Sequence, residues 1–233
     1  MTRTRARRLV VLSCAAAVWA GVAAPPAHAQ AAAARGRVPA EIVAATDFLL
    51  LAYPDLATRG VTFTFNRQAR TVAVSVADRS TGDAVADADR PPLLNAAFAF
   101  TETGELHSFA ANGVLLDPAR NKALTDTLHA NPDWTDTDAE AILQSLGGRP
   151  STGTAPVASF DPARLARFVG GTPAVAAATL EWRPPGDPSA PPPFAAAPAW
   201  TTHVIAARPD GTSVAYRFHF EPFVGRLVMV TRP

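Results

Sequence analysis

The segment Thr201–Val230, TTHVIAARPDGTSVAYRFHFEPFVGRLVMV, decides the fold, because apolar and polar side chains alternate along much of it. Two alternating runs, 201–207 and 213–220, flank Pro209-Asp210-Gly211, which is a typical tight-turn sequence. A third short run, mainly apolar, follows at 226–230. Runs of this length and period predict β-strands, and the short connections between them predict an antiparallel meander.

Similar runs earlier in the chain predict two further antiparallel hairpins. Their strands are expected at 61–65, 72–76, 96–100 and 106–109, and another strand is expected near 176–182. In the second hairpin we expect Leu106 and Ser108 on one face, and His107 and Phe109 on the other. Apolar residues at helical spacing and N-terminal helix signals predict helices at 40–53, 118–129, 135–146 and 162–169.

These elements indicate an α+β fold in which helices pack on an antiparallel sheet. A helix followed by about four strands occurs twice, and this element order resembles that of cystatin-like proteins, with two such units in tandem. The expected parts are an N-terminal α+β unit over 39–148, a linker over 149–157 and a C-terminal α+β unit over 158–233. The sequence leaves open whether the two units form one domain or two.

Residues 1–29 have the features of a secretory signal peptide. Four arginines among the first eight residues precede an apolar run from Leu9 to Ala24, and Ala27 and Ala29 are the small residues at −3 and −1. We expect cleavage after Ala29, a flexible lead-in over 30–38, and a secreted or periplasmic protein without stable membrane insertion. Retention of the segment as an anchor, and lipidation at Cys14, stay open as alternatives.

Charge and cysteine content narrow the range of functions further. Residues 1–29 hold four of the 21 basic residues and none of the 20 acidic ones, so the chain after cleavage has a net charge of −3. An acidic protein is poorly suited to nucleic acid, where affinity comes from neutralising phosphates. The single cysteine is Cys14, so the cleaved chain has neither a disulfide nor a thiol nucleophile.

The strand at 213–220 carries the candidate site. If Pro209-Asp210-Gly211 forms a three-residue loop, His203 lies opposite Arg217, with His219 and Glu221 farther along the same face. These four residues are the expected ligand- or partner-binding set. His203, His219 and Glu221 could also bind a divalent metal, and a histidine with a carboxylate can carry out acid–base chemistry. The simpler interpretation is the polar outer face of a sheet.

Two other groups of residues are weaker candidates. Asp133, Asp136, Asp138 and Glu140 could supply oxygen ligands to calcium, but acids at a helix start are more typical of capping. The larger aromatic side chains could line a pocket, but their spacing is more typical of core residues: Trp134, Trp182, Trp200, Tyr216, Phe218 and Phe220.

The sequence contains no nucleophile elbow, phosphate loop, dinucleotide fingerprint or zinc-protease motif. We therefore expect a non-catalytic binding or accessory module that acts outside the cytoplasm and needs no cofactor, with a protein or small molecule as its partner. The proline-rich loop at 184–199 and the outer sheet face are the expected contact regions. The alternatives are a metal-assisted hydrolase built on the His203/His219/Glu221 face, and a structural envelope protein.

Overall fold

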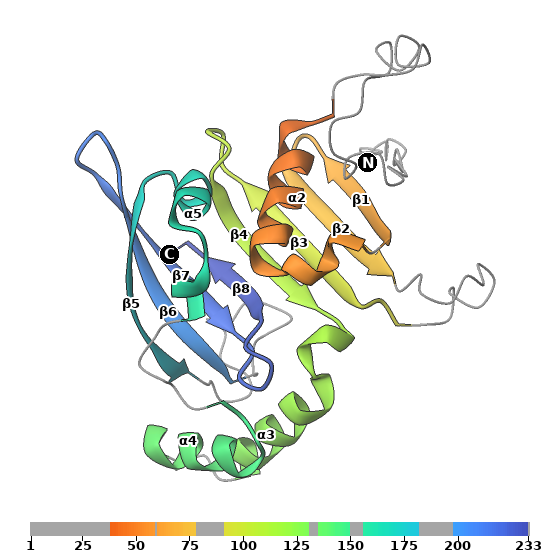
Figure 1. Ribbon diagram of the computed structural model, residues 1–233, viewed down its shortest axis with the longest axis vertical. Helices are drawn as coiled ribbons and strands as arrows, with labels where there is room; N and C mark the ends of the chain where they lie inside the picture. Colours follow the sequence, from red (N-terminus) through yellow and green to blue (C-terminus); the bar gives the residue numbers. More distant parts are fainter. Residues whose placement is uncertain are drawn as a thin grey trace, which may run out of the picture.

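The computed structural model describes residues 38–58, 60–77, 91–130, 135–149, 156–181 and 198–232. The predicted signal peptide, and most of the predicted lead-in, linker and proline-rich loop, lie outside these residues. Among the described residues, eight strands form one antiparallel sheet in the order β1-β2-β3-β4-β8-β7-β6-β5 (Figure 1). They are β1 Gly60–Asn66, β2 Thr71–Ala77, β3 Leu94–Phe100, β4 Leu106–Asn112, β5 Thr172–Glu181, β6 Ala199–Ala207, β7 Ser213–Phe220 and β8 Leu227–Thr231.

Of the helices in the described part of the chain, α2 and α5 cover one face of this sheet, and α3 and α4 lie beyond its end (Figure 1). The α-helices are α2 Ala40–Ala52, α3 Pro118–Ala130, α4 Asp136–Ser145 and α5 Pro162–Val169. Short 3₁₀ turns are η1 Pro54–Thr58, η2 Val114–Leu116 and η3 Pro156–Ser159. Helices α2 and α5 lie over the sheet, and we call the opposite face the outer face. No helix among the described residues is long and apolar enough to cross a membrane.

Local signals explain where α5 begins and ends. The Asp161 carboxylate accepts hydrogen bonds from the backbone N–H groups of Ala163 and Arg164 at 2.8 and 3.0 Å, which satisfies two donors of the first turn. Gly170 ends the helix at φ 70°, a conformation that glycine adopts without steric cost. The buried face of the helix, Leu165, Phe168 and Val169, then packs on the sheet.

The structure confirms the α+β class and the antiparallel sheet, but not the tandem cystatin-like arrangement. Strand β4 pairs with β8, so the strands on either side of α3 and α4 belong to a single sheet. The buried apolar residues form one cluster that draws on both halves of the sheet. At its centre, the Phe48 ring lies 5.3 Å from Phe109 and 5.1 Å from Phe168.

The strand order and the ladder registers correspond on the two sides of the β4–β8 pair, as they would about an approximate two-fold axis between these strands. In the central ladder Phe109 pairs with Val230, with one further pair on each side. Ladder β3–β4 shifts register between Ala99 and Phe100, and ladder β7–β8 shifts between His219 and Phe220. These matching bulges make residues 94–100 of β3 correspond to residues 214–220 of β7.

The bulge also corrects one prediction about β4. Strict alternation along the strand predicts Leu106 and Phe109 on opposite faces of the sheet. In the structure both side chains are fully buried and face the helices. The extra residue at the bulge shifts the alternation by one position, which sends both side chains inward. A second correction concerns β5, which begins at Thr172 and not near residue 176.

Candidate functional site

The turn between β6 and β7 has the register that the sequence predicts. His203 lies opposite Arg217, as expected for a three-residue loop at 209–211. Tyr216, the neighbour of Arg217, is buried and donates to the Val169 carbonyl of α5 at 3.5 Å, so its side chain faces the helices. Side chains alternate along a strand, so His203, Arg217 and His219 lie on the outer face.

The structure does not gather His203, His219 and Glu221 into one site. The exposed His203 has its Nε2 atom 3.7 Å from Glu181 Oε1. His219 is buried, and its Nδ1 atom lies 2.8 Å from the hydroxyl of Thr201, the residue opposite it in the ladder. The described part of the chain holds no group of three or more such side chains arranged to bind a metal ion. The predicted metal alternative therefore finds no support in these positions.

Glu221 has its hydrogen bonds within the fold. It is 2% exposed, and its Oε1 accepts from Asn121 Nδ2 and from the Phe223 N–H, both at 2.9 Å. Its Oε2 accepts from the Val224 N–H at 2.5 Å. Burial raises the pKa of the Glu221 carboxyl, and the N–H groups of Val224 and Phe223 oppose that rise. These contacts fix the β7–β8 turn against α3, which is a structural task.

The acidic group near α4 forms a helix cap where the structure describes it. Thr135 Oγ1 accepts from the Asp138 N–H at 3.2 Å, and Asp138 Oδ2 accepts from the Thr135 N–H at 3.1 Å. Hydrogen bonds from Thr135 lower the pKa of Asp138. This reciprocal pair is a capping box and confirms the capping interpretation for Asp138. Asp133 and the side chain of Asp136 lie outside the described residues.

The described aromatic candidates belong to the core. Tyr216, Phe218 and Phe220 are at most 1% exposed. Trp200 is 5% exposed, and its indole N–H donates to the Arg149 carbonyl at 3.0 Å. Trp134 and Trp182 lie outside the described residues.

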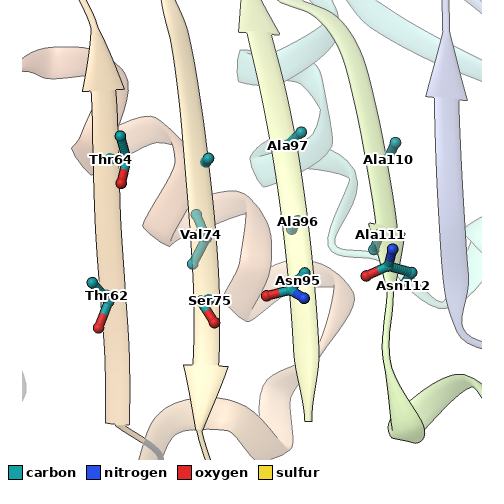
Figure 2. A pocket seen from close by; sticks show the side chains of 11 residues that line it. Thr62, Thr64, Val74, Ser75, Asn95, Ala96, Ala97, Ala110, Ala111 and Asn112 are labelled. Atoms are coloured by element: carbon teal, nitrogen blue, oxygen red, sulfur yellow. The ribbon is translucent and has the colours of Figure 1, made fainter. Parts of the chain in front are cut away.

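An open groove of about 350 Å³ lies on the outer face of strands β1 to β4. Figure 2 shows its side chains on the neighbouring strands β1 to β4, with α2 behind the sheet. None of the eleven lining residues carries a charge. They are Thr62, Thr64, Ala73, Val74, Ser75, Asn95, Ala96, Ala97, Ala110, Ala111 and Asn112.

The groove has two chemically different rows that cross the strands in register. The first row is polar and consists of Thr62, Ser75, Asn95 and Asn112 (Figure 2). The second row begins at Thr64 and continues through Ala73, Ala97 and Ala110. Hydroxyl and amide groups both donate and accept hydrogen bonds, whereas the three alanine methyl groups offer only apolar contact. The groove therefore presents an uncharged polar row beside a narrow apolar one.

Small side chains explain why the groove lies on this half of the sheet. The matching bulges make Ala97 correspond to Arg217, and the ladders then make Ala73 correspond to His203. The N-terminal half thus has two methyl groups where the C-terminal half has a guanidinium and an imidazole. The predicted site and the groove occupy corresponding places on the outer face.

Sequence reasoning missed the groove because it searched for titratable and aromatic groups. The available signal was the polar half of the alternation at Thr62, Thr64, Ser75 and Asn95, where every outward side chain is small. Small residues in a strand are uninformative until the uncovered face of the sheet is known.

No protein family matches the chain, and no curated protein matches it. Among solved structures, the chain is similar to the crystal structure of a protein with unknown function from Clostridium leptum DSM 753. The two share 10% sequence identity over 84% of this chain and 88% of that chain, with a TM-score of 0.26.

Proposed function

We propose that the protein is a non-catalytic binding or accessory module that acts outside the cytoplasm and holds an uncharged ligand in the groove of β1 to β4. The observation that carries the proposal is the groove itself, with its row of hydroxyl and amide groups beside a row of alanines. Its lining contains no nucleophile with a base and no charged group. Such a surface suits a ligand rich in hydroxyl or amide groups with a small apolar face.

Filling the groove tests this proposal. Ala97→Arg places a long side chain among the alanines, and the sheet should tolerate it because Arg217 occupies the corresponding position of β7. We expect the purified wild-type protein to bind members of an array of neutral saccharides and uncharged peptides. The Ala97→Arg variant should lose this binding at least ten-fold.

Ala215→Arg is the matched control, because Ala215 is exposed on the outer face of β7 and does not line the groove. It should bind like the wild type. Equal binding by the wild type and both variants would show that the ligand does not bind in the groove. Absence of binding by the wild type on the whole array would contradict a binding role for uncharged ligands of these classes.

Export is the second part of the proposal and rests on the sequence of residues 1–29. Expression of the full chain in a secreting bacterium should give protein outside the cytoplasm that begins at Gln30. Mass spectrometry of the recovered protein measures this directly. Ala29→Arg should block cleavage, because the peptidase requires a small residue at −1. Recovery of the full-length chain in the cytoplasm would contradict export.

A further inference from the structure

The two edges of the sheet differ in how well they are protected against pairing with another strand. Strand β5, at one edge, contains Pro173 and a register shift between Val175 and Ala178. Proline and bulges are among the features that prevent an edge strand from pairing with another chain. Strand β1, at the other edge, pairs with β2 over all seven of its residues without a shift.

The sequence of β1 adds none of the usual protective features. Residues 60–66, GVTFTFN, contain no proline and no charged side chain. Val61, Phe63 and Phe65 are only partly buried on the helix side, although all three pack against the core. The described part of the chain places no strand beyond β1. One row of its backbone N–H and C=O groups therefore has no strand partner within the sheet, and a further strand would satisfy it.

We propose that β1 pairs with β1 of a second copy of this chain, antiparallel and about a two-fold axis through Phe63. This register is the one that pairs all seven residues, because it sets Gly60 opposite the partner's Asn66. It places Val61 opposite the partner's Phe65 and Thr62 opposite the partner's Thr64. Apolar side chains then meet on the helix side and threonines meet on the outer face, so both faces continue across the junction.

Pairing also completes the groove, and this step rests on the proposed function. Thr62 and Thr64 line the groove on the edge strand β1 in one copy. In the pair, the partner's Thr64 and the partner's Thr62 would lie beside them, and the two grooves would join into one surface across the axis. A ladder of seven residues is about 23 Å long. A single ladder of this length buries less surface than the roughly 800 Å² per partner that is typical of a stable interface. We therefore expect a reversible dimer.

Charge placed on β1 tests the pairing. Light scattering after size exclusion should give the wild-type protein twice the monomer mass at high concentration, with the mass falling on dilution. Thr62→Lys with Thr64→Lys puts like charges opposite each other, so this variant should be monomeric. Thr62→Glu with Thr64→Glu should also be monomeric. An equimolar mixture of the two variants should regain the dimer mass, because each lysine then faces a glutamate.

The control is Ala177→Lys with Thr179→Lys on β5, at two exposed positions of the opposite edge. It should dimerise like the wild type. Wild-type protein that stays monomeric at its highest soluble concentration overturns the proposal and leaves the edge for an extended segment of another protein. A dimer that survives lysines on β1, or a mixture that stays monomeric, also overturns it. Wild-type protein that is monomeric at every concentration but still binds a ligand would overturn the pairing and leave the proposed function intact.

Discussion

Asn121 on α3 donates from Nδ2 to Glu221 Oε1 over 2.9 Å, and this bond joins residues one hundred positions apart. The same amide donates to the Leu116 carbonyl at 2.6 Å. One side chain thus anchors the start of α3 both to the preceding 3₁₀ turn and to the β7–β8 turn.

Removing the Glu221 carboxylate should destabilise the protein strongly. Glu221→Ala leaves one N–H of the Asn121 amide and the N–H groups of Phe223 and Val224 without their acceptor. A buried donor that loses its partner costs about 1–3 kcal/mol, so we expect a loss of roughly 2–4 kcal/mol in the free energy of unfolding. Urea unfolding measures it. Glu102→Ala, at an exposed turn position, should change stability by no more than about 0.5 kcal/mol.

The pH dependence of stability should reveal the buried state of Glu221. Burial raises its pKa in the folded protein, so the folded chain binds more protons than the unfolded chain above the ordinary glutamate value of 4.5. The contribution of Glu221 to stability therefore grows as the pH falls from 7 toward 4.5. Glu221→Gln does not titrate in this window.

The measurement is the difference in unfolding free energy between wild type and Glu221→Gln at several pH values. We expect that difference to increase in favour of the wild type as the pH falls. Asp117, Asp138 and Asp210 have lowered pKa values, but they are present in both proteins and largely cancel in the comparison. A difference that shrinks at lower pH would contradict the raised pKa.

Phe48 should be among the most costly core residues to truncate. Its ring contacts Phe98, Phe109 and Phe168, which come from β3, β4 and α5. Phe48→Ala should cost about 3–5 kcal/mol in the free energy of unfolding. Phe65→Ala on the edge strand β1 is the matched control, and its smaller burial should make the loss clearly lower. Equal losses of unfolding free energy at the two positions would show that the Phe48 ring is packed no more tightly than the ring of Phe65.

The capping box of α4 offers a local test. Thr135→Ala removes the acceptor for the Asp138 N–H and should cost about 1 kcal/mol. Thr137→Ala, two residues later in the same helix, removes an exposed hydroxyl outside the cap and should be nearly neutral. Hydrogen exchange in 136–139 should speed up in the first variant only. Equal exchange in the two variants would contradict the cap.

The strands and the β6–β7 register could be predicted because their signals are local. The turn sequence at 209–211 fixes the loop length, and the loop length fixes His203 opposite Arg217. The bulge at Ala99 and Phe100 could not be predicted, since one extra residue leaves no mark in an alternating pattern. The pairing of Phe109 with Val230 joins strands more than a hundred residues apart and has no local signal.

The candidate site was predictable in part for the same physical reason. The sequence correctly placed His203, Arg217 and His219 on one face. It could not show that the Glu221 carboxylate accepts hydrogen bonds from Asn121 and from the backbone of the β7–β8 turn. The groove exists because α2 packs on the other face of the sheet and leaves the Thr62 face uncovered. Which face a helix covers depends on tertiary structure and has no local signal in the sequence. Small neutral residues became informative only after that face was known.

The approximate two-fold axis between β4 and β8 has a consequence for how this protein tolerates change. In a dimer of identical short chains, every substitution appears twice, once on each side of the axis. Here a single chain carries both sides, so Ala97 and Arg217 can differ while their surroundings stay alike. The N-terminal half can keep small uncharged side chains where the C-terminal half has larger polar ones. A new binding specificity can therefore arise in one half without changing the other.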